Sequence, residues 1–180
     1  MKKVIVAISF AILFIMGAVN NVSASVNYLQ EMTTLGQYPN RLQNGSQPYK
    51  YYYGENSRYN DYTPHSEIKV IAPKNSDVIV IVKYGNKDGD VAGHIYISAG
   101  NAGVIKLRNN RYYQTFFYYG LNWDSQKLMA NGVRGGFTKG EAFSKDGSPV
   151  YLYDNILTYE LTITYDGNFS TTRSNEEEIF

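Results

Sequence analysis

Residues 156–165 constrain the fold of this chain more than any other segment. Leu157, Tyr159, Leu161 and two further apolar residues occupy alternate positions, and three threonines and Glu160 lie between them. Successive side chains of a strand point to opposite faces, so this pattern predicts a strand with one buried and one wet face. Half-buried strands of this kind are typical of antiparallel sheets, and we expect this strand to belong to an antiparallel sheet.

Similar short segments recur through the middle of the chain. We predict strands over residues 68–72, 77–84, 91–98, 104–107 and 111–119, with turns at 88–89, 99–103 and 109–110 between them. Residues 77–84 are β-branched and apolar on both faces, which is typical of a central strand. No stretch has a convincing helical period. The spacing therefore predicts an all-β fold, an antiparallel immunoglobulin-like β-sandwich of about seven strands.

Residues 1–24 have the pattern of a secretory signal peptide. Lys2 and Lys3 provide a positive start, residues 4–19 are apolar, and Val22-Ser23-Ala24 is a small-residue cleavage pattern. The apolar run is shorter than the roughly 20 residues that a membrane-spanning helix needs. We therefore expect an exported bacterial protein, located in the periplasm, at the cell surface or outside the cell.

The remaining chain divides by composition. Residues 25–66 are polar and tyrosine-rich without a sustained period, so we expect an irregular N-terminal arm that lies loosely against the domain. Residues 67–172 form the predicted sandwich, and residues 173–180 form a C-terminal tail. A segment of about 30 residues, 120–149, separates two strong strands, and we expect it to be a long loop insertion.

Composition also bears on function. The chain has 17 Lys+Arg against 16 Asp+Glu, and this balance gives no electrostatic case for nucleic acid. The absence of Cys removes disulfides, thiolate metal sites and cysteine-linked lipid anchors. His65 and His94 lack the spacing of a zinc site, and the sequence contains no nucleophile elbow or phosphate-binding loop. We therefore predict no catalytic residues, no metal, no cofactor and a monomeric chain.

Residues 77–120 follow a sequence of turns that has a family likeness. A strand leads to the Asp88-Gly89 turn, then to an Ala99-Gly100 turn, and residues 107–110 (Leu-Arg-Asn-Asn) precede an aromatic strand that starts at Tyr112. This order resembles carboxypeptidase-regulatory-like and related transthyretin-like β-sandwich modules, although Arg108 and Asn110 stand where that pattern commonly has Pro and Gly. The whole chain also resembles small secreted proteins of Bacteroidetes-type bacteria. The resemblance implies an immunoglobulin-like accessory or adhesion module and carries no active site.

Two aromatic groups are candidate binding residues. The 120–149 segment holds Trp123, the single Trp, together with Phe137, and the arm holds Tyr51, Tyr52 and Tyr53. Loops carry function disproportionately, so Trp123 and neighbouring tyrosines are candidates for a stacking platform for sugar rings or a protein partner, with Phe137 as a further candidate binding residue. In the alternative interpretation, which we favour, they pin the loop onto the sandwich.

Three functions remain open from the sequence. The first is a secreted, non-enzymatic module that binds an unknown protein or glycan, because tyrosine supplies stiff, amphipathic contact area. The second is a small outer-membrane β-barrel. Its strands need roughly ten alternating residues, a pattern that only residues 156–165 have. The third is a polysaccharide-active enzyme, for which Glu141, Asp146, Asp154 and Glu160 are the available acids.

Overall fold

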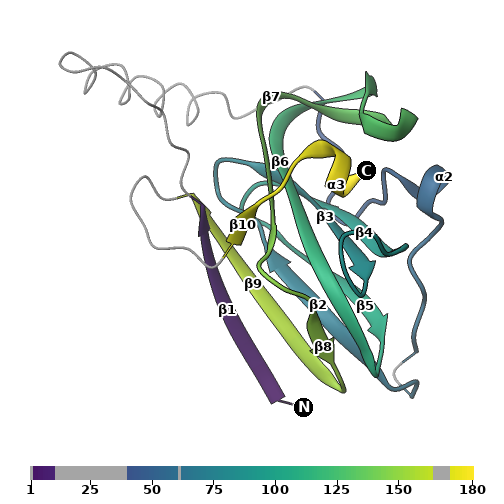
Figure 1. Ribbon diagram of the computed structural model, residues 1–180. Helices are drawn as coiled ribbons and strands as arrows, with labels where there is room; N and C mark the ends of the chain where they lie inside the picture. Colours follow the sequence, from purple (N-terminus) through teal and green to yellow (C-terminus); the bar gives the residue numbers. More distant parts are fainter. Residues whose placement is uncertain (1, 11–39, 61, 164–170) are drawn as a thin grey trace.

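The computed structural model describes residues 2–10, 40–60, 62–163 and 171–180, which form ten strands and three short helical segments (Figure 1). The strands are β1 (Lys2–Phe10), β2 (His65–Ile71), β3 (Asp77–Tyr84), β4 (Val91–Ile97), β5 (Ala102–Arg108), β6 (Arg111–Leu128), β7 (Arg134–Asp146), β8 (Val150–Leu152), β9 (Asn155–Ile163) and β10 (Thr171–Arg173). The helical segments are α2 (Lys50–Tyr53), the 3-10 turn η1 (Ala130–Gly132) and α3 (Glu176–Ile179). The sequence also predicts a turn at Asp166-Gly167 and a short return strand from Phe169. Both lie outside the described residues, as do residues 25–39 of the arm.

Two sheets pack face to face, which confirms the all-β sandwich (Figure 1). The first sheet has the strand order β1-β9-β2-β5. The second has the order β10-β7-β6-β3-β4, with β8 also paired to β6. β1 comes from the segment predicted to be a signal peptide, and it lies parallel to β9 at the edge of the first sheet.

One pairing differs from the prediction. β9 lies parallel to β2, with Leu157 opposite Ile68, so the antiparallel neighbours expected for residues 156–165 are wrong. A parallel pair needs a long crossover, and strands β3, β4, β6, β7 and β8 of the second sheet lie between β2 and β9 in the sequence. The alternation in β9 arises because the outer face of the first sheet is exposed at Glu160 and Thr162, and this is independent of strand direction.

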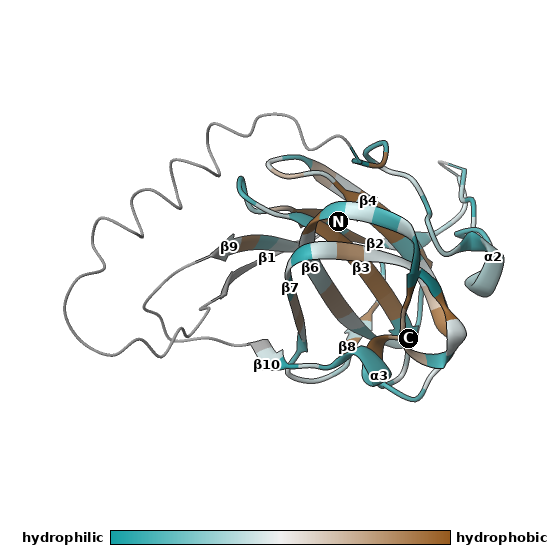
Figure 2. Cartoon of the chain, turned by 90° about the horizontal axis from the view of Figure 1, so that it is seen from above, coloured by the Kyte–Doolittle hydropathy of each residue, from teal (hydrophilic) through white to brown (hydrophobic). Residues whose placement is uncertain are grey.

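The first core fills the space between the sheets. Alternate residues of β2, β3, β4, β5, β6 and β9 point into it, as the sequence pattern predicts for β4, β6 and β9. β3 is buried on both faces from Asp77 to Lys83, and it is a central strand as predicted. Figure 2 shows the hydrophobic colouring concentrated on β3. The largest members of this core are Tyr113, Phe117, Tyr119 and Tyr159.

A second core covers the outer face of the second sheet. Tyr96, Phe116 and Tyr118 point outward from their strands, and they are covered by residues of the arm, the β6–β7 hairpin and α3. The arm is therefore firmly held at Tyr49, while much of its described part is exposed. Tyr49 is fully buried in this core. The tyrosine run that follows forms the helical turn α2, whose C-cap is Gly54 with a φ of 78°.

The predicted loop over residues 120–149 is instead most of a long β-hairpin. β6 continues to Leu128, η1 makes the turn, and β7 returns to Asp146. The pairing shifts register between Tyr119 and Leu121 and again between Asp124 and Leu128. Glycine and asparagine at such irregular positions look like loop signals in the sequence, but here they let paired strands bend over the second core.

Candidate functional site

Trp123 and Phe137 face each other across the β6–β7 pairing. Their ring centroids are 5.5 Å apart in an edge-to-face arrangement. Phe137 is fully buried and Trp123 is 7% exposed. Neither ring offers a face to a ligand, so the structure places both residues in the packing of the hairpin, which agrees with the anchoring interpretation.

Gly135 explains how the indole fits so closely beneath the hairpin. Its φ is 107°, in the region that favours glycine, and a Cβ atom at this position would lie 2.5 Å from Cζ2 of Trp123. The glycine therefore lets the β7 backbone adopt this conformation and lie directly against the ring.

Tyr49 ties the start of α2 to both the hairpin and the sheet. Its hydroxyl donates to the Gly135 carbonyl at 2.9 Å, and its backbone N–H donates to Nε2 of His94 at 3.1 Å. Its ring centroid lies 5.1 Å from that of Phe180 and 5.9 Å from that of Trp123. Burial raises the pKa of Tyr49 well above its usual value, so the hydroxyl stays a donor.

Tyr53 is partly buried, and its hydroxyl donates to the carbonyl of Phe180 at 3.4 Å. Its ring centroid lies 6.1 Å from that of Tyr49 and 6.0 Å from that of His94. Burial raises the pKa of Tyr53 to about 12. Tyr49 and Tyr53 together fix the orientation of α2.

Tyr51 and Tyr52 point away from the buried contacts that Tyr49 and Tyr53 make. Tyr51 is 90% exposed and Tyr52 is 39% exposed, and their ring centroids are 5.3 Å apart, edge to face. The Tyr52 hydroxyl accepts a hydrogen bond from the backbone N–H of Arg134 at 3.0 Å. The structure therefore joins the arm tyrosines to the hairpin, the two places that the sequence offered as separate candidates.

The hairpin tip contributes two exposed residues that sequence reasoning missed. Leu128 is 63% exposed and lies opposite Arg134 in the β6–β7 pairing. The Arg134 guanidinium donates to the carbonyl of Gln126 at 3.2 Å, which keeps it at the tip. We call the four residues Tyr51, Tyr52, Leu128 and Arg134 the α2–hairpin surface. No periodic signal marks it, because it is assembled from segments about 80 residues apart.

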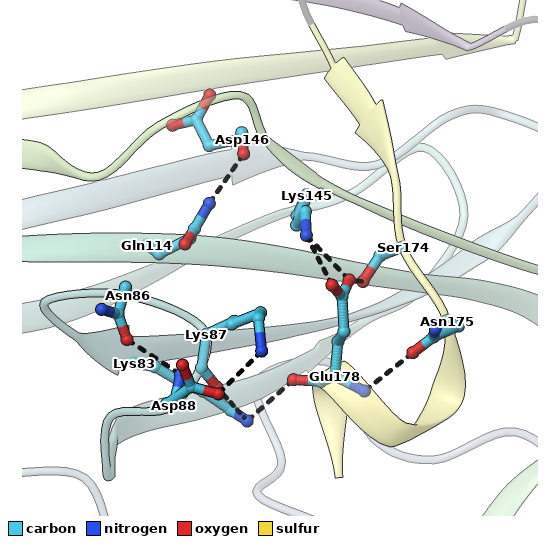
Figure 3. Close-up of polar contacts among 10 residues, drawn as sticks. All are labelled: Lys83, Asn86, Lys87, Asp88, Gln114, Lys145, Asp146, Ser174, Asn175 and Glu178. Atoms are coloured by element: carbon cyan, nitrogen blue, oxygen red, sulfur yellow. Dashed lines mark hydrogen bonds and ion pairs between the residues drawn. The ribbon is translucent and has the colours of Figure 1, made fainter.

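A polar network joins α3 to β3 and β7 (Figure 3). Lys145 donates to both carboxylate oxygens of Glu178 at 2.8 Å, and Ser174 donates to the same group at 2.8 Å. The hydrogen bond from Lys145 lowers the pKa of Glu178. Lys83 donates to the backbone carbonyls of Glu178 at 2.8 Å and Lys87 at 3.1 Å, and burial lowers its pKa. These bonds position Ile179 and Phe180 in the second core.

Two of the acids considered for catalysis are engaged in internal contacts. Glu141 accepts a hydrogen bond from the Tyr118 hydroxyl and pairs with Lys127, whose amine also donates to the Phe137 carbonyl at 2.7 Å. Asp146 accepts a hydrogen bond from Tyr159, and burial raises its pKa. Both carboxylates therefore have a packing role that accounts for their position.

No protein-family model, curated protein or solved structure matches this chain. The resemblance to carboxypeptidase-regulatory-like and transthyretin-like modules therefore stays a prediction. In the part of the chain that the structure describes, none of the helices has the length and apolar character needed to cross a membrane.

Proposed function

We propose that this protein is a non-enzymatic binding module that contacts a protein partner through the α2–hairpin surface. The carrying observation is that Tyr51 and Tyr52 are exposed on a short element whose base is fixed by buried contacts of Tyr49 and Tyr53. Binding then requires little further ordering of the surface, which favours affinity.

The composition of the surface supports a protein partner. Tyrosine and arginine are enriched among the residues that dominate protein interfaces, and an exposed Leu beside them adds apolar contact area. Leu128 and Arg134 lie opposite each other, and Tyr52 is bonded to the Arg134 backbone. The four side chains thus present two aromatic rings, one aliphatic group and one fixed positive charge.

We further propose that the protein acts after export. The support is the sequence of residues 1–24, with its lysine pair, apolar run and small-residue cleavage pattern. Mass spectrometry of the protein recovered from a bacterial host tests this directly. A mature chain that begins at Ser25 is expected, and an intact N-terminus on the accumulated protein would contradict export by this route.

The binding proposal is tested by capture of partners on immobilised protein, using a double variant Tyr51→Ala/Tyr52→Ala. The matched control is Tyr62→Ala, because Tyr62 is 95% exposed and lies outside the α2–hairpin surface. A partner that is retained by the control and lost by the double variant supports the proposal. Loss of two central aromatic residues should weaken binding by about 30-fold or more.

A glycan array run with the same three proteins distinguishes the ligand class. Glycan binding that depends on Tyr51 and Tyr52 would support the α2–hairpin surface as the binding site, but it would contradict the proposal that the ligand is a protein. Partners or glycans that bind the double variant as well as the control would overturn the surface itself.

A further inference from the structure

The arm covers β4, the edge strand of the second sheet, with strand-like backbone hydrogen bonds. The N–H of Gly45 donates to the carbonyl of Tyr96 at 2.9 Å, and the N–H of Tyr96 donates to the carbonyl of Ser46 at 2.8 Å. Further along β4, the Asn56 side-chain amide bonds both backbone groups of His94, at 2.8 Å and 2.9 Å. The outward backbone groups of these β4 residues are thus satisfied, which is how proteins protect an exposed edge.

β5 is the corresponding edge of the first sheet, and its free groups can be located from its pairing. β5 runs antiparallel to β2, and just beyond the paired segment the N–H of Ala72 donates to the carbonyl of Asn101 at 2.9 Å. Hydrogen-bonded pairs alternate along an antiparallel ladder. Asn101 and every second residue after it therefore face β2, while Val104 and Lys106 direct their N–H and C=O groups away from it.

Both ends of this edge are closed, and its middle is open. The Asn44 side chain donates to the carbonyl of Ala102 at 3.1 Å, and the Tyr113 hydroxyl donates to the carbonyl of Arg108 at 2.7 Å. Within the described ranges, no residue hydrogen-bonds to the outward backbone groups of Val104 and Lys106. Two donors and two acceptors in strand geometry are consequently left unpaired.

These groups lie at a groove of about 290 Å³ between the arm and the sandwich. Its lining includes arm residues 55–59, Ile95 of β4, and Val104 and Lys106 of β5. An extended chain that enters the groove would meet the free backbone groups of β5.

We propose that this groove binds an extended peptide, which adds to β5 as an antiparallel strand and carries an acidic residue two positions before an apolar one. The side chains of Val104 and Lys106 point to the outer face of the first sheet, since Ile105 and Leu107 point into the first core. Directly opposite residues on adjacent strands pair their side chains. In an antiparallel partner, the residue opposite Lys106 precedes the residue opposite Val104 by two positions, which sets the order acidic-x-apolar.

The side chains at this edge match such a peptide. Val104 is 40% exposed, an apolar surface that a neighbouring aliphatic residue would cover. Lys106 forms no ion pair with any residue in the described part of the chain, and Glu67, opposite Lys106 on β2, pairs with His65 at 3.3 Å. A carboxylate on the added strand would therefore find an available amine.

The test uses the full chain and fluorescent, capped octapeptides with Asp-x-Val at the centre, measured by anisotropy. Reversal of the central motif to Val-x-Asp should weaken binding by about tenfold, because Val would then face Lys106 and Asp would face Val104. N-methylation of the Asp or the Val should also weaken binding by about tenfold or more, because each of these N–H groups bonds to β5. N-methylation of the residue between them should leave binding within about twofold, because that N–H faces away from β5.

Variants of β5 provide the second arm. Val104→Pro removes the outward N–H without removing a bond to β2, and it should abolish binding, whereas Val104→Thr keeps the N–H and should retain it. Lys106→Glu should reverse the preference toward Lys-x-Val peptides. A melting temperature measured for each variant shows that the fold is intact.

Several results would overturn the proposal. These are an absence of binding by every Asp-x-Val peptide at millimolar concentration, equal effects of N-methylation at all three positions, or binding unchanged by Val104→Pro. A dimer of the full chain that Val104→Pro dissolves, without peptide binding, would instead assign the edge to a second copy. None of these results depends on Tyr51 or Tyr52, so the edge and the α2–hairpin surface succeed or fail separately.

Discussion

Trp123 is packed against Phe137 and Tyr49 in the second core, with 7% of its surface exposed. Trp123→Ala would leave a large cavity under the hairpin, and we expect it to lower the free energy of unfolding by about 3–5 kcal/mol. Urea unfolding followed by far-ultraviolet circular dichroism measures this. An unchanged midpoint would mean that the indole does not anchor the hairpin.

Protonation of His94 is expected to make the stability of the fold depend on pH. It is fully buried, and burial lowers its pKa from 6.5 to about 4, with a smaller opposing effect of the Gln47 carbonyl. The folded state therefore holds His94 neutral, and its stability is intact above pH 6.5. As the pH falls from about 6.5 toward 4, the unfolded state binds the proton first, and up to about 3 kcal/mol of stability is lost.

Comparison of His94→Gln with the parent chain isolates this effect. Gln retains an acceptor for the Tyr49 N–H but does not titrate. We expect the variant to lose less stability than the parent between pH 7 and pH 4, measured by urea unfolding at each pH. Other groups titrate in both proteins, including Asp146, whose raised pKa acts in the opposite direction. Identical pH profiles would show that His94 is accessible to protons in the folded state.

Within β9, neighbouring residues differ sharply in burial. Leu161 is buried in the first core, and Thr162 is exposed on the outer face of the first sheet. Leu161→Asp should cost more than about 3 kcal/mol, because it buries an unpaired charge, and Thr162→Asp should cost less than about 1 kcal/mol. The melting temperatures of the two variants test the prediction. Similar losses would mean that β9 is covered on both faces.

The elements also show how far sequence reasoning reaches. Strands β3, β4 and β5 and the N-terminal half of β6 were predictable because their periodicity reports the buried face directly. The rest of the β6–β7 hairpin was not, since Asn122, Gly135 and Gly140 have positive φ and imitate loop signals. The exposure of Tyr51 and the burial of Tyr49 were equally invisible, because contacts with the hairpin and α3 decide them.

For the whole molecule, the arrangement of β1 predicts the effect of removing residues 1–24. β1 lies at an edge and pairs only with β9, so its loss leaves every other described strand pairing in place. We expect the truncated chain to give a β-type far-ultraviolet dichroism spectrum and a single cooperative melt. A spectrum typical of an unfolded or helical chain would contradict this organisation.

The proposed function depends on the division between buried and exposed aromatic residues, and one pair of measurements on Tyr51→Ala/Tyr52→Ala tests this division most directly. The melting temperature and the affinity for the captured partner are recorded on the same preparation, with Tyr62→Ala as the control. We expect a melting temperature within about 2 °C of the parent and affinity weakened by about 30-fold or more. A large drop in melting temperature with affinity retained would contradict it, because Tyr51 and Tyr52 would then belong to the scaffold.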